Sequence, residues 1–143
     1  MSDGYGYRGY LASRPVRGQR TPQQVQNLVI RDYAQRHGLA FKLSAAEYAM
    51  PSCYMVLEAV LDELDRLEGI ICFSLFMLPE RPERRAEIYR RVLKGGRSLH
   101  GALEGLAVRD ARDVARLEDI FLVDRAAATA LPASLSEFAH GLC

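Results

Sequence analysis

The sequence has no tryptophan, few prolines and no excess of either charge. Its net charge of +1 excludes the strongly basic surface of a dedicated nucleic-acid-binding protein, so nucleic acid is not an expected partner. Cys53, Cys72 and Cys143 have no Cys-x-x-Cys spacing, so neither a disulfide framework nor a closed zinc site is predicted. No apolar run approaches the ~18–20 residues that span a membrane, and no signal peptide is recognisable. We therefore expect a cytoplasmic protein with reduced thiols.

The composition is that of a globular protein. Of the 143 residues, 49% are hydrophobic and 26% are charged, both close to the average for folded domains. This length favours one compact domain over residues 1–143. We place its core at about residues 5–125 and a C-terminal helix or tail at 126–143.

Strand-like and helix-like patterns alternate along the chain. Strands are predicted at residues 7–13, 39–43, 69–75 and 98–103, and helices at 21–38, 53–64, 82–93 and from Asp110 through Phe121. The apolar run at 69–75 is continuous, as in a parallel strand that is covered on both faces. The alternation predicts an α/β fold, a three-layer αβα sandwich with four to five mainly parallel strands, flavodoxin-like or resolvase-like.

The first predicted helix has the clearest start. Thr21 is an expected N-cap, Pro22 suits the first helical position and Gln24 the capping-box position. Helical spacing predicts that its buried face carries Val25, Leu28, Val29 and Tyr33. Cys53 is expected in the first turn of the next helix, where it either becomes a reactive thiol or packs in the core.

In open α/β sheets ligands bind beyond the carboxyl ends of the strands, which places the candidate site on the loops there. Arg8, Arg14, Arg17 and Arg20 precede a helix N-terminus, an arrangement that suits a phosphate or carboxylate. The alternative is a solvated loop whose arginines pair with surface carboxylates.

Four residues are candidates for catalysis. Ser13 could act as a nucleophile with His100 as its base, although such residues are more often a turn serine and a hydrogen-bonded strand histidine. Glu47 could be an acid or base beside Tyr48 as an orienting phenol, or the two could belong to a loop folded over the sheet end. The candidate phosphate- and substrate-binding residues are Arg8, Arg14, Asn27, Arg31, Ser44, Ser74 and Glu104. No histidine and carboxylate spacing indicates a metal, and no cofactor is predicted.

Two resemblances follow from longer motifs. The segments 10–13 (YLAS), 24–26 (QVQ), 33–38 (YAQRHG) and 93–99 (LKGGRSL) resemble the serine recombinase catalytic domain over residues 7–125. Leu11 replaces that family's strand arginine, and Phe76-Met77 replaces its Asp-Arg pair. The resemblance therefore implies a fold and no recombinase activity.

The second resemblance is closer and covers residues 5–120. Its motifs are 6–10 (GYRGY), 22–33 (PQQVQNLVIRDY), 47–51 (EYAMP), 61–64 (LDEL) and 74–79 (SLFMLP), with Leu99-His100 and Glu104. These resemble the sporadic carbohydrate cluster protein family. The resemblance implies a role in surface-polysaccharide or unusual-sugar biosynthesis without naming a reaction.

Two functions remain in competition. The first is a small enzyme that binds a sugar phosphate or nucleotide-sugar at the carboxyl ends of the strands. The second is a non-catalytic subunit that forms a homodimer through the C-terminal helix and docks to a larger biosynthetic enzyme through that helix and the apolar segment 76–78.

Overall fold

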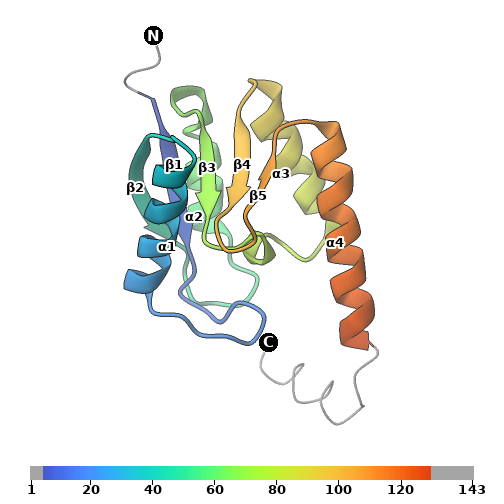
Figure 1. Cartoon of the computed structure of the whole chain (residues 1–143). Coiled ribbons are helices and arrows are strands. Elements are labelled where there is room, and N and C mark those ends of the chain that lie inside the picture. Colours follow the sequence, from blue (N-terminus) through green and yellow to red (C-terminus); the bar gives the residue numbers. More distant parts are fainter. Residues whose placement is uncertain (1–4, 130–143) are drawn as a thin grey trace.

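The computed structural model describes residues 5–129, which form one five-stranded sheet flanked by helices (Figure 1). The strands are β1 (Tyr7–Leu11), β2 (Phe41–Ala46), β3 (Gly69–Cys72), β4 (Ser98–Gly101) and β5 (Leu106–Val108). The helices are α1 (Gln23–Arg36), α2 (Met55–Leu61), α3 (Pro82–Lys94) and α4 (Ala111–Thr129), with short 3-10 turns η1 (Leu64–Arg66) and η2 (Leu75–Met77).

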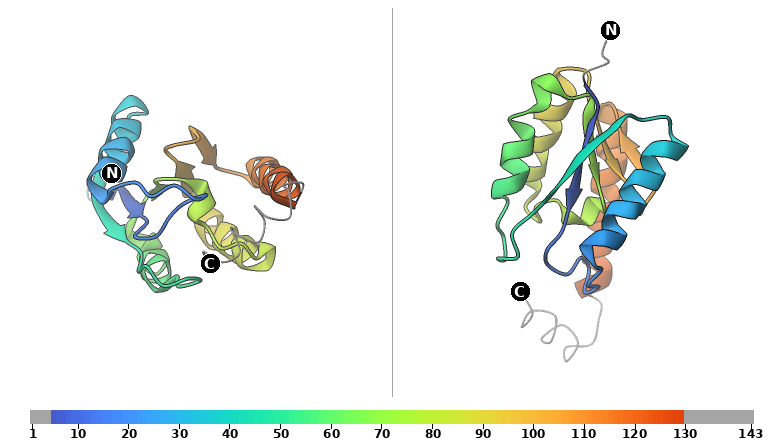
Figure 2. Two further views of the ribbon diagram at one scale, coloured as in Figure 1. Left: turned by 90° about the horizontal axis from the view of Figure 1, so that it is seen from below. Right: turned by 90° about the vertical axis from the view of Figure 1, so that its left-hand side faces the viewer.

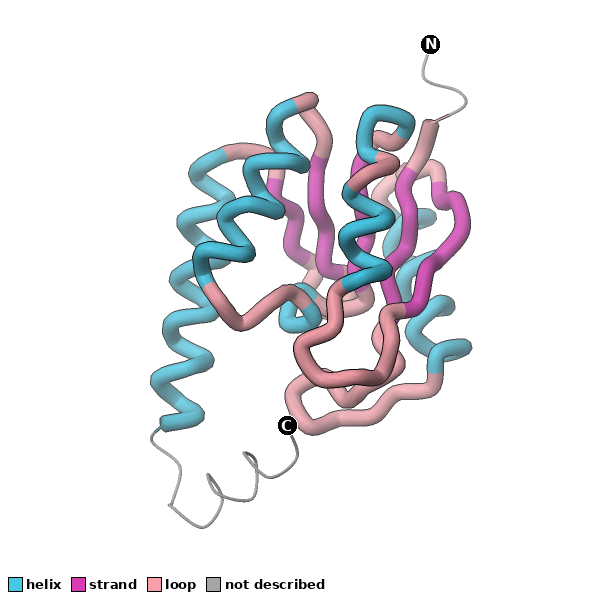
Figure 3. Tube along the Cα trace, turned by 180° about the vertical axis from the view of Figure 1, so that it is seen from behind, coloured by secondary structure: helices cyan, strands magenta, loops and turns pink. Residues whose placement is uncertain are grey.

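The strand order is β2-β1-β3-β4-β5, with four parallel strands and β5 antiparallel to β4. Helix α1 covers one face of the sheet, and α2 and α3 cover the other (Figures 2 and 3). Helix α4 packs beside β5. It is joined to α3 by a hydrogen bond from Arg85 of α3 to Glu118 of α4. The predictions of an α/β class, a mainly parallel sheet and three layers are confirmed, as is the central position of the strand that begins at Gly69.

The core lies on both faces of β3, whose four residues are all buried. Leu57 and Val60 of α2 and Ile88 and Val92 of α3 pack against one face. Burial of these continuous apolar residues accounts for the unbroken hydrophobic run in the sequence, because no side of the strand meets water.

The predicted buried face of α1 is only partly correct: Tyr33 is buried and Val29 packs half-buried against the core, as predicted. Val25 and Leu28 are exposed, whereas Ile30 and Tyr33 are buried together with the polar Gln26. The helix is rotated because the Gln26 side chain bonds to the end of β1, which sets the buried face at positions 26, 30 and 33. The expected Thr21 cap is also absent, because α1 begins after Pro22 and no side chain caps it.

Several predicted boundaries shift. The second strand is Phe41–Ala46 and not 39–43, so Ser44 lies within a strand. Helix α2 begins at Met55, so Cys53 precedes the helix and does not lie in its first turn. The first, third and fourth strands end at Leu11, Cys72 and Gly101, earlier than predicted.

The last helix begins as predicted. The Asp110 carboxylate accepts a hydrogen bond from the Asp113 amide at 3.0 Å, and the Asp113 carboxylate accepts one from the Arg109 amide at 2.9 Å. This reciprocal capping satisfies two free amides at the helix start. Helix α4 continues through the first part of the alanine-rich segment to Thr129, and the rest of the predicted tail lies outside the described residues.

Candidate functional site

The candidate site lies at the carboxyl ends of the parallel strands, where the loops after β1, β2, β3 and β4 meet (Figure 1). The crossover after β1 leads to β2 on one side of the sheet, and the crossover after β3 leads to β4 on the other side. The direction in which the chain crosses the sheet therefore reverses between β1 and β3. Ligands of open α/β sheets bind at such a reversal point. We call the loops around it the rim: residues 12–22, 47–54, 73–81 and 102–105.

Ser13 lies at the rim directly after β1 and is half-buried. Its hydroxyl accepts a hydrogen bond from Gln23 Nε2 at 2.8 Å. The adjacent Ala12 backbone is held by Gln26, which accepts from the Ala12 amide and donates to the Ala12 carbonyl. The first turn of α1, which has no side-chain cap and no acidic residue, is therefore fixed beside the Ser13 hydroxyl.

Ser74 and Glu104 form a second polar pair at the rim, after β3 and β4. The Ser74 hydroxyl donates to Glu104 Oε2 at 2.6 Å, and the Leu75 amide donates to Glu104 Oε1 at 2.9 Å. Ser74 also accepts from the Phe76 amide, which caps η2. Ser74 is buried and Glu104 is half-buried, so the carboxylate is the accessible member of the pair.

Glu47 follows β2 and is buried beneath the surface of the rim. Its carboxylate accepts hydrogen bonds from the Tyr10 hydroxyl (2.7 Å) and from the amides of Leu57 (2.9 Å), Val56 (3.0 Å) and Tyr48 (3.1 Å). Burial acts to raise the pKa of Glu47, but the Tyr10 hydroxyl and the three amides together hold it below its ordinary value. Glu47 thus caps the start of α2 as a carboxylate, and this geometry supports its structural interpretation. Tyr48 is exposed beside it.

Arg14 holds the loop between β2 and α2. Its Nη1 donates to the carbonyls of Met50 (2.9 Å), Cys53 (3.1 Å) and Tyr48 (3.2 Å). The guanidinium also lies 4.9 Å from the centre of the Tyr54 ring. Arg14 therefore stabilises the rim through Nη1. Only the other nitrogens of its guanidinium could bind a ligand phosphate as predicted.

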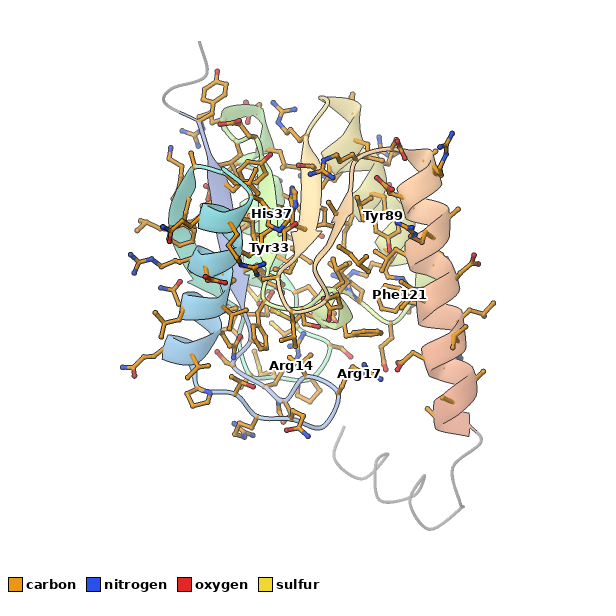
Figure 4. All side chains as sticks on the ribbon, viewed as in Figure 1. Arg14, Arg17, Tyr33, His37, Tyr89 and Phe121 are labelled. Atoms are coloured by element: carbon orange, nitrogen blue, oxygen red, sulfur yellow. The ribbon has the colours of Figure 1, made fainter. Side chains whose placement is uncertain are left out.

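Arg17 connects the first loop to α4. It pairs with Asp124 at 2.6 Å and lies over the Phe76 ring at 4.4 Å. Phe76 packs edge to face against Phe121, and Arg85 lies 4.0 Å from the Phe121 ring on α4 (Figure 4). These alternating cation and ring contacts tie α3 and α4 to the loop after β1.

His100 lies inside the fold and not at the rim. Its Nδ1 is 2.7 Å from the Tyr33 hydroxyl, and its Nε2 is 2.8 Å from the Ser98 hydroxyl. The imidazole is fully buried on the α1 side of the sheet, with Tyr33 stacked on His37 beyond it (Figure 4). Both ring nitrogens are occupied, and the Ser13 hydroxyl is bonded to Gln23, so the structure does not bring Ser13 and His100 together.

This burial predicts a loss of stability in mild acid. Burial, reinforced by the charges of Arg109 and His37, lowers the pKa of His100 to about 4. An unfolded chain protonates the ring near pH 6.5, so the unfolded state binds more protons below that pH. We expect unfolding free energy to fall by about 3 kcal/mol between pH 6.5 and 4, and to be independent of this ring above pH 6.5.

Urea unfolding at pH 7.0, 6.0 and 5.0 measures this loss, and the NMR titration of the His100 ring measures its cause. The step from pH 7.0 to 6.0 reports mainly on the histidine, because carboxylates with a lowered pKa, such as Glu47, lose stability only as pH falls toward the ordinary carboxyl value. Titration of the folded ring near pH 6.5 would contradict the prediction.

The other predicted binding residues are separated. Arg8 points from β1 toward the α2 side of the sheet, where Nη1 donates to the Leu43 carbonyl at 3.2 Å. Asn27 of α1 accepts from the Ser44 hydroxyl of β2 at 2.6 Å, so these two residues join a helix to its strand. Arg31 is exposed on α1. Arg8 and Arg14 have different surroundings, because Arg8 bonds to β2 and Arg14 bonds to the loop between β2 and α2.

Three residues that were not among the predicted site residues shape the rim: Gln23, Gln26 and Tyr10. Gln26 lies in the same helical phase as Ile30 and Tyr33, and a polar residue in a buried phase is the signal that could have indicated it. Tyr10 is an aromatic residue near the end of a buried strand, and such a hydroxyl requires a partner inside the fold.

Within residues 5–129 no three histidine, cysteine or acidic side chains gather closely enough to hold a metal ion. None of the helices in this range is long and apolar enough to cross a membrane. Comparisons with known proteins find no matching family model, no matching curated protein and no matching solved structure.

Proposed function

We propose that the protein binds a phosphorylated or nucleotide-activated sugar at the rim and acts on it as a small enzyme of carbohydrate biosynthesis. The observation that carries this proposal is the convergence of Ser13 and Ser74 at the reversal point between β1 and β3. The uncapped first turn of α1 lies beside them, and its free amides suit a phosphate. The four parallel strands have the order 2-1-3-4 found in flavodoxin-like folds, which bind a phosphorylated ligand between strands 1 and 3. Strand β5 differs because it is antiparallel.

The side chains at the rim suit different parts of such a ligand. Arg20 is exposed directly before α1 and provides positive charge for a phosphate. Glu104 accepts hydrogen bonds and so suits a sugar hydroxyl. Of the two predicted carboxylates, Glu104 is the half-buried one and Glu47 is enclosed, so we assign the role of general base to Glu104 in place of His100.

A thermal unfolding screen with sugar phosphates, nucleotide-sugars and free nucleotides tests the proposal. A ligand at about 100 times its Kd adds about 2.7 kcal/mol, a rise in Tm of roughly 5–10 °C for a domain of this size. We expect Arg20→Glu to abolish the shift for phosphorylated ligands. Arg112→Glu is the matched control, because Arg112 is exposed at the start of α4, at the opposite end of the sheet.

A shift that survives both Arg20→Glu and Glu104→Gln would place binding elsewhere and refute the assignment. If no ligand in the panel raises the Tm of the unaltered protein, ligand binding at the rim is itself refuted.

A specific observation favours the competing function, a non-catalytic subunit that forms a homodimer through α4. Leu122 and Val123 are 67% and 68% exposed on that helix, and adjacent exposed apolar residues favour a contact surface. A dimer in sedimentation combined with the absence of any ligand shift would support this alternative over the enzyme.

A further inference from the structure

A cleft of about 600 Å³ lies at the end of the sheet opposite the rim, beside the turn between α3 and β4 (Figure 1). One wall comes from the last residues of α3 and the turn that follows, and the other comes from the end of α2 and from η1. The buried residues Leu61 and Leu64 add apolar surface to it. The volume lies within the range of about 300–1,000 Å³ that small-molecule sites occupy.

Some of the charged side chains around this cleft already have partners. Arg91 of α3 pairs with Glu58 and Asp62, and Arg90 pairs with Glu87. These arginines join α3 to α2 or to a neighbouring turn of α3, and their charges are compensated. They therefore do not count toward the binding of a ligand.

Three other charged side chains that line the cleft form no ion pair within residues 5–129. They are Lys94 and Arg97 on the α3 side and Asp65 on η1. Lys94 and Asp65 are exposed, and Arg97 is half-buried. The cleft thus holds two uncompensated cations and one uncompensated carboxylate.

The Arg97 guanidinium is held in place by the backbone around it. Its Nε donates to the Leu67 carbonyl at 2.9 Å. Its Nη1 lies so close to Gly95 that it occupies the position where a Cβ of residue 95 would stand. Within the described part of the chain, Nη1 and Nη2 make no hydrogen bond. A guanidinium fixed through Nε with both Nη atoms unused suits an oxyanion, because these atoms can donate two parallel hydrogen bonds to it.

Cations near the end of a helix also have an ordinary explanation, since a helix C-terminus attracts positive charge. That explanation fits Lys94, which lies in the last turn of α3. It does not account for Arg97, which lies beyond the helix and donates to Leu67, a residue in the segment before β3. The position of Arg97 therefore requires another reason.

We propose that this cleft is a second phosphate site, in which Arg97 and Lys94 bind the phosphate group of a compact phosphorylated ligand. A phosphate monoester carries a charge of about −1.5 to −2 at pH 7, which two cations match better than they match the single charge of a carboxylate. Asp65 accepts a hydrogen bond from a hydroxyl group of the same ligand. The site goes beyond the proposed function, because none of its residues belongs to the rim loops.

An NMR titration of the full chain with inorganic phosphate locates the binding. We expect saturable shifts of the amide signals of Gly95 and Gly96, which flank the Arg97 guanidinium in the turn after α3. We expect acetate to bind about tenfold more weakly, because it carries less charge. The amide of Gly105, in the rim, reports separately on the proposed function.

Gly95→Ala tests the position of the guanidinium, because it keeps every charge and displaces only the end of the Arg97 side chain. The φ of Gly95 is −100°, which alanine can adopt, so the Tm should be retained. We expect Gly95→Ala and Arg97→Gln each to weaken phosphate binding about tenfold. Arg66→Gln is the matched control, because Arg66 is exposed, unpaired in the described residues and outside the lining of this cleft, and its Kd should stay within twofold.

Three outcomes would overturn the proposal. One is equal weakening in Arg97→Gln and Arg66→Gln, which indicates general attraction of anions. Another is full phosphate affinity in Gly95→Ala, which shows that the placed guanidinium is not used. The third is the absence of saturable shifts at Gly95 and Gly96. If shifts appear instead at Gly105, phosphate binds at the rim, which supports the proposed function while it refutes the second site.

Discussion

Replacement of Arg85 by methionine is expected to lower the free energy of unfolding by about 3–5 kcal/mol. The Arg85 side chain is buried and donates four hydrogen bonds, two to Glu118 and one each to the carbonyls of Pro79 and Glu80. Glu118 also accepts from the Tyr89 hydroxyl at 2.6 Å. Methionine fills similar space but leaves these acceptors without their donor, and removal of one partner of a partly buried ion pair is costly.

Chemical unfolding of Arg85→Met beside Arg90→Met measures this effect. Arg90 lies on the same helix and forms an exposed pair with Glu87, which solvent screens, so its loss should change stability little. Equal losses for the two variants would show that the Arg85 network adds nothing beyond a surface pair. The hydrogen bond from Arg85 also lowers the pKa of Glu118, so the stabilisation should decline as pH falls below 4.5.

Glu47→Gln is expected to cost about 2–4 kcal/mol although it changes only one atom. A carboxylate can accept all four hydrogen bonds from Tyr10 and the three amides, whereas a glutamine side chain has one acceptor oxygen and an NH2 group. The NH2 group would face backbone amides that also donate. At least one buried donor at the start of α2 would lose its partner.

Urea unfolding at pH 7 measures the loss, with Glu58→Gln as the matched control because Glu58 is an exposed carboxylate on the same helix. The lowered pKa of Glu47 gives the pH dependence its sign: the carboxylate contributes stability above about pH 4.5 and loses it as pH falls through the folded-state value. A variant as stable as the native protein would show that the α2 cap is dispensable.

The layer architecture followed from the sequence because its signals are local and strong. The continuous apolar run correctly placed the start of β3 at Gly69, although the strand ends at Cys72, three residues earlier than predicted. The predicted helix 82–93 matches α3 to within one residue. The face of α1 was predicted only in part because tertiary hydrogen bonds of Gln26 decide it, and apolar spacing carries no information about them. Strand β5 is three residues long, too short for a period-two pattern to indicate.

The location of the candidate site could be predicted, but the roles of its residues could not. Topology places the loops after parallel strands at one end, and Ser13, Ser74 and Glu104 do lie there. Whether a polar residue faces the ligand or braces the fold depends on contacts between distant segments. Glu47 binds the α2 amides and His100 binds Tyr33, 67 positions away, and neither partner is evident from spacing.

The antiparallel direction of β5 determines where a tether or label can be joined to the chain without covering the rim. Because β5 returns the chain to the amino end of the sheet, α4 starts there and runs down past the carboxyl ends of the strands (Figure 1). The chain therefore enters the sheet at the end opposite the rim and leaves α4, at Thr129, on the rim side. A surface tether or fluorescent label joined near Tyr5 leaves the rim accessible for binding measurements. One joined near the end of α4 lies at the same end of the molecule as the rim and can obstruct it.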